Sequence, residues 1–300
     1  MGSDHIAVCI CTFRRPRMLD RLLSCLETQR AGNQFTWSVV VVDNDAGESA
    51  RATVEAFRAR GRLDVSYTVA AEQNIARARN AAVDRAEGTY VAFIDDDEFP
   101  PENWLLRLLE TCRAYNADGV LGPVLPYFQT PPPQWVVKGR VFERPMHTTG
   151  HWLDWENTRT GNVLFRSAVF DAPDARFDHL FGSGGEDREF FRRMIAKGHR
   201  FVWCAEAGVH ETVPAFRWGQ SFLFRRALLR GQVSVLHDSG KTAGVAKSAA
   251  AALFYALALL PSLLSGRHLF VDYLVRLGDH LGRVLASAGI RLVREMYVTH

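Results

Sequence analysis

Phe93-Ile94-Asp95-Asp96-Asp97-Glu98 is the most informative stretch of this chain, because three consecutive aspartates follow directly on the apolar segment 90–94. Ionised aspartates carry hard oxygen ligands of the type that Mg2+ and Mn2+ prefer, and their mutual repulsion is costly unless a cation or solvent neutralises it. Taken alone, the stretch has two interpretations, a cation site at the end of a strand or a solvated acidic turn.

Two earlier apolar runs also end in polar residues. Residues 6–11 lead into Thr12, and residues 38–42 lead into Asp43. Short, β-branched and nearly continuous runs are expected of buried parallel strands. Leucines at helical spacing predict a helix over 17–29 between them, and Pro16 is placed to start it. The segment predicts a βαβ unit.

A second unit follows, with a helix expected over 45–60, a strand over 65–69, an alanine-rich helix over 74–86 and a strand over 90–94. In open α/β sheets, ligands bind beyond the carboxyl ends of the strands. Thr12, Asp43 and the three aspartates all fall at such ends, so the sequence predicts an α/β fold with a site at this edge.

These segments, in this order, resemble family 2 glycosyltransferases with the GT-A fold, a Rossmann-like, mostly parallel sheet flanked by helices. The motifs that carry the resemblance are Thr12-Phe13-Arg14-Arg15-Pro16, Val41-Val42-Asp43-Asn44, Ala78-Arg79-Asn80, the DxD element Asp95-Asp96-Asp97, Thr160-Gly161-Asn162 with Phe165-Arg166, Gly185-Glu186-Asp187, and His210. The resemblance covers roughly residues 5 to 212 and looks closest to bacterial exopolysaccharide glycosyltransferases of the succinoglycan type.

The resemblance implies an inverting, metal-dependent transfer of a sugar from a nucleoside diphosphate sugar, with UDP the most common base in similar enzymes. Asp97 and His210 would hold Mg2+ or Mn2+, and Asp187 would be the catalytic base, with Glu186 beside it as the rival. The remaining residues that would contact the nucleotide sugar are Thr12, Phe13, Arg14, Asp43, Arg79, Asp95, Asp96 and Asn162. A guanidinium matches phosphate oxygens, so Arg79 is expected to clamp a phosphate.

Other classes of protein remain in view. A nicotinamide-dependent dehydrogenase is disfavoured because the turn after the first strand lacks G-x-G-x-x-G. A sugar nucleotidyltransferase would be expected to open with a glycine-rich phosphate loop, which is absent. A catalytically inactive carbohydrate-binding or scaffold protein stays an alternative, although Asp95, Asp97 and Asp187 are all present. Nothing in the chain indicates nucleic-acid binding.

Residues 213–300 form a second predicted region, a helical appendage to a catalytic domain at 1–212. It carries eleven Lys and Arg against four Asp and Glu, in a chain whose net charge is +3. Residues 248–266 are uncharged, and leucines at helical spacing follow. This pattern favours an interfacial membrane anchor. A hairpin packed on the catalytic domain or on a second copy in a homo-oligomer, and a true span, are the alternatives, because Pro261 and the alanines weaken insertion.

The expected location is therefore the cytoplasm, at the inner face of the cell membrane. The N-terminus shows no secretory signal pattern, and five scattered cysteines favour a reducing compartment. A glycan acceptor carried on a polyprenyl diphosphate would suit an enzyme held at that surface.

The segment 123–157 contains three consecutive prolines and is predicted to be a long loop. Trp135, Trp152 and Trp155 lie in it, either as stacking partners for acceptor sugars or as core or lid residues.

Overall fold

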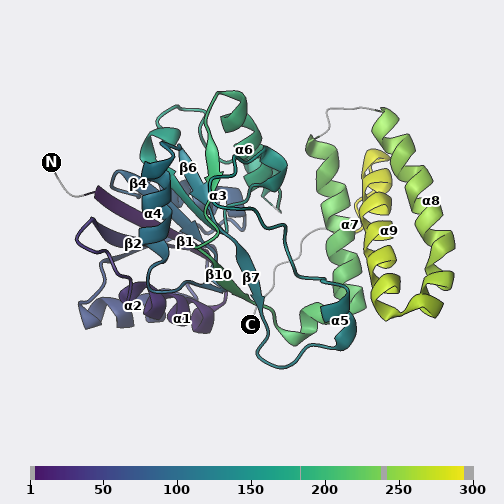
Figure 1. Ribbon diagram of the computed structural model, residues 1–300, viewed down its shortest axis with the longest axis horizontal. Coiled ribbons are helices and arrows are strands. Elements are labelled where there is room, and N and C mark those ends of the chain that lie inside the picture. The colour runs from purple at the N-terminus through teal and green to yellow at the C-terminus, as the bar shows by residue number, and fades with distance from the viewer. Residues whose placement is uncertain (1–3, 183, 238–241, 294–300) are drawn as a thin grey trace.

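The computed structural model describes residues 4–182, 184–237 and 242–293 (Figure 1). Its centre is a sheet that has seven strands among these residues, in the order β3-β2-β1-β4-β8-β6-β9. The strands are β1 (Asp4–Thr12), β2 (Phe35–Asp43), β3 (Val65–Val69), β4 (Tyr90–Ile94), β6 (Gly119–Leu121), β8 (Asn162–Arg166) and β9 (Phe201–Trp203). β1, β2, β3 and β4 run parallel, which confirms the predicted βαβ units.

Strand β8 runs antiparallel between β4 and β6. Its register pairs Asn162 with Ile94, so the segment that enters β8 lies at the carboxyl end of β4. Residues 158–161 therefore reach the same edge of the sheet as Asp95 to Asp97, although the sequence separates them by more than sixty positions.

Helices cover both faces of the sheet, which is why its inner strands are apolar throughout. One core contains side chains of α1 (Pro16–Glu27), α2 (Arg51–Arg60) and α4 (Trp104–Ala114), and the other those of α3 (Ile75–Val83) and α6 (Glu186–Ala196). In α1, Leu19, Leu22, Leu23 and Leu26 are fully buried. Their spacing places all four on the stripe that faces the sheet.

A smaller sheet joins β5 (Glu98–Phe99), β10 (Val209–Thr212) and β7 (Val124–Tyr127). It lies beside the carboxyl end of β4 because β5 begins right after the aspartate run. Four short 3-10 helices within the described residues complete the domain, η1 (Trp155–Asn157), η2 (Ser167–Phe170), η3 (His179–Phe181) and η4 (Ala215–Trp218).

The C-terminal region consists of α7 (Gln220–His237), α8 (Thr242–Ser265) and α9 (Arg267–Ser287). α9 lies between the other two, with α7 toward the two sheets and α8 outermost (Figure 1). Glycines allow α7 and α9 to pack backbone against backbone. A Cβ on Gly231 would lie 2.0 Å from the Asp279 carbonyl oxygen, and one on Gly282 would lie 2.2 Å from that of Leu228.

Two sequence-based expectations about secondary structure were wrong in part. The helix expected over 45–60 begins only at Arg51, because Asp43 accepts the Ala50 N–H at 2.7 Å and Asp45 accepts that of Gly47, which holds 45–50 in turns. The long loop contains β7 and α5 (Gln134–Lys138). Trp135 of α5 is buried against Leu223 and Val271, so this segment packs on the C-terminal helices.

Candidate active site

A cavity of about 620 Å³ opens at the carboxyl edge of the large sheet. One side is formed by the ends of β1 and β4, the segment before β8 and the start of α6, and the facing side is formed by α7. The residues that face it include Thr12, Phe13, Asp95, Asp96, Asp97, Arg79 and Asp187, all expected from the sequence. The ends of β1 and β4 therefore meet at one pocket, whereas Asp43 at the end of β2 does not line it.

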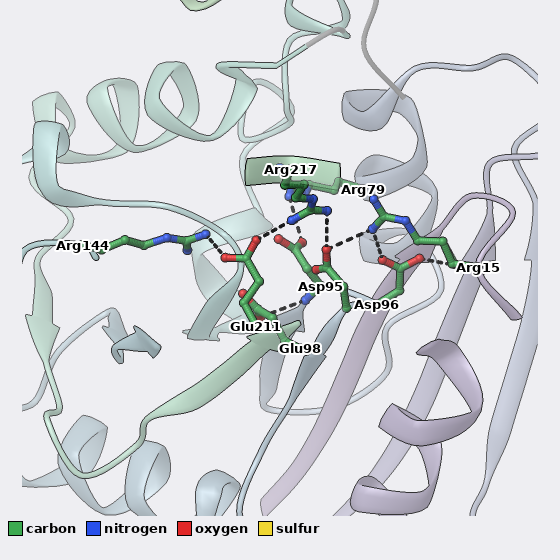
Figure 2. Close-up of polar contacts among 10 residues, drawn as sticks. Arg15, Arg79, Asp95, Asp96, Glu98, Arg144, Glu211 and Arg217 are labelled. Atoms are coloured by element: carbon green, nitrogen blue, oxygen red, sulfur yellow. Dashed lines mark hydrogen bonds and ion pairs between the residues drawn. The ribbon is translucent and has the colours of Figure 1, made fainter. Parts of the chain in front are cut away.

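Asp96 anchors the floor of this pocket. Its carboxylate accepts a hydrogen bond from the Thr12 hydroxyl at 2.7 Å and pairs with Arg15 at 2.7 Å (Figure 2). Burial raises the pKa of Asp96 to about 6, and the charge of Arg15 opposes that rise. These contacts fix the turn after β1 against the end of β4.

Asp97 belongs to a network of arginines that the sequence did not reveal. Its Oδ2 pairs with Arg15 at 3.2 Å and with Arg217 Nη2 at 2.9 Å. The other terminal nitrogen of Arg217 donates to Glu211 at 2.9 Å, and Arg144 also pairs with Glu211 (Figure 2). One guanidinium therefore bridges a carboxylate of the turn between β4 and β5 and a carboxylate of β10, and Arg217 itself is buried.

Arg79 links the aspartate run to the Glu186-Asp187 pair. It lies 3.4 Å from Asp95 and forms a buried ion pair with Glu186. Burial raises the pKa of Glu186 to about 7, opposed by the charge of Arg79. Asp187 instead lines the cavity. Of the two neighbours, Glu186 is held beneath the pocket and Asp187 is presented to it.

The site offers oxygen donors suited to a divalent cation. Asp95, Asp97 and Glu211 supply carboxylates, and the position between Asp97 and Glu211 already holds a positive group, the guanidinium of Arg217. In the part of the chain that is described, no three side chains are arranged as a ready-made metal site. The donor chemistry fits Mg2+ or Mn2+, and binding would require these carboxylates to exchange arginine partners.

Three residues expected in the site lie elsewhere. Asp43 is fully buried and accepts from the Ala50 N–H and the Tyr67 hydroxyl, while its neighbour Asn44 lines the cavity. Arg14 pairs with Asp45 outside the pocket. The Asn162 side chain is buried and donates to the carbonyl oxygens of Pro123 and Ala207, and accepts from Trp104, so it joins loops instead of facing a sugar.

His210 also lies away from the pocket. It is exposed and stacks on Phe99 with ring centroids 5.3 Å apart. Successive side chains of a strand point to opposite faces, so the next residue, Glu211, faces the aspartates. The side chain of this strand that lines the cavity is thus a carboxylate one position after His210.

The three tryptophans of the 123–157 segment do not line the cavity either. Trp135 is buried in the core shared with α7 and α9, Trp155 packs against the sheet, and Trp152 contacts the Arg200 guanidinium at 3.8 Å from its ring centroid. Trp135 and Trp155 are therefore core residues and not stacking partners for a sugar in this cavity. Arginine side chains line the cavity where tryptophans were considered.

Comparisons with known proteins identify the family to which this chain belongs. Residues 7–177 match the model of glycosyl transferase family 2. The succinoglycan biosynthesis protein ExoM of Rhizobium meliloti (strain 1021) is 38% identical over 232 residues, which cover 76% of this chain and 73% of that protein. The chain belongs to glycosyl transferase family 2 and is a glycosyltransferase.

A chondroitin synthase of Pasteurella multocida (strain Pm70) is 27% identical over 239 residues, but the match covers only 23% of that protein. Among solved structures, S. aureus TarS 1-349 in complex with UDP-GlcNAc matches with a TM-score of 0.56 at 17% identity, covering 96% of this chain and 93% of that one. The similarity of structure confirms the GT-A fold.

Proposed function

We propose that this protein transfers a sugar from a UDP-sugar to a hydroxyl group of a glycan acceptor, with inversion, during synthesis of a bacterial exopolysaccharide. The relative that is 38% identical is a succinoglycan biosynthesis protein, and structures of similar fold carry UDP and UDP-GlcNAc. The observation that carries the proposal is that Asp187, Asp95, Asp97 and Arg79 line the same cavity.

Asp187 is the proposed base. A carboxylate at the cavity surface can take a proton from the acceptor hydroxyl as that oxygen attacks the anomeric carbon from the face opposite the diphosphate. Glu186 cannot do this without leaving its ion pair with Arg79, so its proposed role is to position that arginine. Arg79 in turn lies next to Asp95, on the donor side of the site.

Departure of a nucleoside diphosphate leaves negative charge that the pocket must stabilise. Asp95, Asp97 and Glu211 are the residues that would hold Mg2+ or Mn2+, and the cation would supply positive charge to that diphosphate. Arg15 and Arg217 hold Asp97 in place from two sides. His210 has no part in this proposal because its ring stacks on Phe99.

We also propose that α8 lies against the inner face of the cell membrane, where a lipid-linked acceptor would be met. Residues 244–265 of α8 are long and apolar enough to cross a bilayer, and little of this apolar stretch is buried inside the protein. One such helix is weak evidence for a span. Leu253, Leu257, Leu260 and Leu264 follow one another along one exposed stripe, as an interfacial helix requires.

The test of the function is release of UDP from candidate UDP-sugars in the presence of membranes from a polysaccharide-producing bacterium. The Asp187→Asn variant should bind UDP as the wild type does and release it at least about 10²-fold more slowly during turnover. A wild-type protein that binds UDP but transfers no sugar under any of these conditions would favour the non-catalytic alternative.

A further inference from the structure

The walls of the cavity carry more positive than negative charge. Among the described residues that line it there are eight arginines and five carboxylates. Arg15, Arg79, Arg144 and Arg217 are paired with those carboxylates or with Glu186. Arg230 pairs with Asp279 on α9 through two contacts of 2.8 and 3.0 Å. The excess must therefore lie on the arginines that remain.

Three arginines remain, Arg159, Arg188 and Arg226, and two of them, Arg159 and Arg226, come from the facing walls of the cleft. Neither guanidinium forms a hydrogen bond or an ion pair within the described parts of the chain, although both line the cavity. The pKa of each is lowered to about 10, first by partial desolvation within the cleft and then by neighbouring arginines. Arg159 is half-buried and Arg226 is exposed, so both guanidinium groups are available to an anion that enters the cleft.

The two arginines line the same cavity from different elements, although they are 67 positions apart in the sequence. Arg144 repels both of them and Glu211 attracts both, so both lie within electrostatic range of that pair. Arg159 also interacts with the charge of Asp187, the proposed base. The anion that they would bind therefore sits next to the reacting centre.

Arg226 lies on α7, and the side chains next to it indicate which class of ligand the cleft can bind. Phe222, Leu229 and Val233 line the cavity on the same helix, one turn before Arg226 and one and two turns after it. The wall thus offers one cation flanked by apolar side chains. A phosphate attached to a sugar ring or to a lipid chain has this combination of charge and apolar surface.

We propose that Arg159 and Arg226 form a phosphate-binding subsite, half of which is supplied by the C-terminal helix α7. This inference rests on the proposed function, because its ligand is either the diphosphate of the donor or a phosphate carried by the acceptor. In both cases Arg159 from one wall and Arg226 from the other would each make a bidentate contact with the phosphoryl oxygens.

The experiment uses the full-length protein and its Arg159→Gln, Arg226→Gln and Arg226→Lys variants, with Arg225→Gln as the matched control. Arg225 is the neighbouring arginine on α7, is exposed and does not line the cavity. Titration calorimetry measures binding of UDP, competition against UDP measures binding of uridine, and a second titration adds inorganic pyrophosphate to protein saturated with UDP. Melting temperatures confirm that each variant is folded.

A subsite for the donor predicts that both glutamine variants weaken UDP binding about tenfold or more and leave uridine binding unchanged. If the subsite serves the acceptor, both glutamine variants should bind UDP as the wild type does. The UDP-saturated wild type should bind pyrophosphate, and both glutamine variants should bind pyrophosphate at least about tenfold more weakly. Arg226→Lys keeps the positive charge, so it should lose less affinity than Arg226→Gln does, whether the affected ligand is UDP or pyrophosphate.

The proposal is overturned if both glutamine variants bind UDP and pyrophosphate as Arg225→Gln does. Failure of the proposed function has a different signature, since wild-type protein would then bind no UDP. In that case pyrophosphate is titrated into the ligand-free protein. Weaker binding in the two glutamine variants would support the anion subsite, and binding equal to that of the control would refute it.

Discussion

Replacing Leu257, Leu260 and Leu264 by glutamine should detach the protein from lipid vesicles without unfolding it. These side chains are 71%, 75% and 93% exposed, so none of them contributes much to the folded state in water. Glutamine has nearly the same helix propensity as leucine, which preserves α8. Any change in vesicle binding can then be assigned to the apolar stripe.

The expected magnitude follows from the exposed surface. Full burial of a leucine side chain is worth roughly 1.5–3 kcal/mol. Scaled by their exposed fractions, the three leucines would contribute roughly 4 to 7 kcal/mol if the bilayer buried the surface that water now covers, so at least about 4 kcal/mol is expected. That corresponds to a partition coefficient roughly 10³-fold lower in the triple variant, and a helix that enters less deeply would show a smaller loss.

Flotation of the protein with vesicles that contain anionic lipid, at low salt, measures the partition coefficient directly. Leu180→Gln is the control, because Leu180 is 70% exposed in η3 of the catalytic domain. The reasoning is refuted if the triple variant floats with the vesicles as well as the wild type does. It is equally refuted if wild-type protein ignores vesicles and forms a dimer that the triple substitution dissociates, since the stripe would then be a contact between two copies.

Three further predictions concern the catalytic domain. Asp187→Asn should lower turnover by about 10²-fold or more and leave the affinity for UDP unchanged. Glu186→Gln should also weaken UDP binding, because Arg79 loses its ion-pair partner. If Glu186→Gln lowers turnover more than Asp187→Asn does and leaves UDP binding intact, Glu186 and not Asp187 is the base. Arg217→Met should lower the free energy of unfolding, measured with urea, by roughly 3 kcal/mol, because Asp97 and Glu211 lose a buried partner. The control Arg276→Met removes an exposed ion pair and should cost about 0.5 kcal/mol. Equal losses in the two variants would contradict a stabilising role for the Arg217 contacts. Burial raises the pKa of Asp96 from 3.8 to about 6, so the native state binds the proton more tightly and stability should fall as the pH rises from 3.8 to about 6. Urea titrations across that range should show a smaller fall in Asp96→Asn, and an unchanged slope would contradict the shift.

The strands of the large sheet were predictable because burial on both faces leaves a continuous apolar run that few other structures require. Segments 65–69 and 90–94 have the bounds that their composition indicates. The helix before β3 was predicted to begin too early, because helical spacing alone does not reveal that side-chain hydrogen bonds hold residues 45–50 in turns. Side-chain competition for backbone groups is a local effect that apolar periodicity cannot report.

The arginines of the site were not predictable in the same way. Arg217 and Asp97 are 120 positions apart, and no periodicity connects them. The choice between His210 and Glu211 depends on which face of β10 meets the aspartates, and that is set by pairing with β5 and β7. A shift of one residue reverses the faces of a strand, so a motif can locate this strand without deciding which side chain enters the pocket.

The three aspartates show how far apart the roles of identical neighbours can be. The side chain of Asp95 is 48% exposed, whereas those of Asp96 and Asp97 are 5% and 8% exposed. Asp96 fixes Thr12 and Arg15, and Asp97 is held between Arg15 and Arg217. Asp95 therefore has the carboxylate that is most open to an incoming ligand, while a cation that approaches Asp97 must first compete with two guanidinium groups. The strength of donor binding then depends on those arginines as well as on the aspartates, which is why substitutions at Arg15 and Arg217 should change nucleotide affinity even where they leave the fold intact.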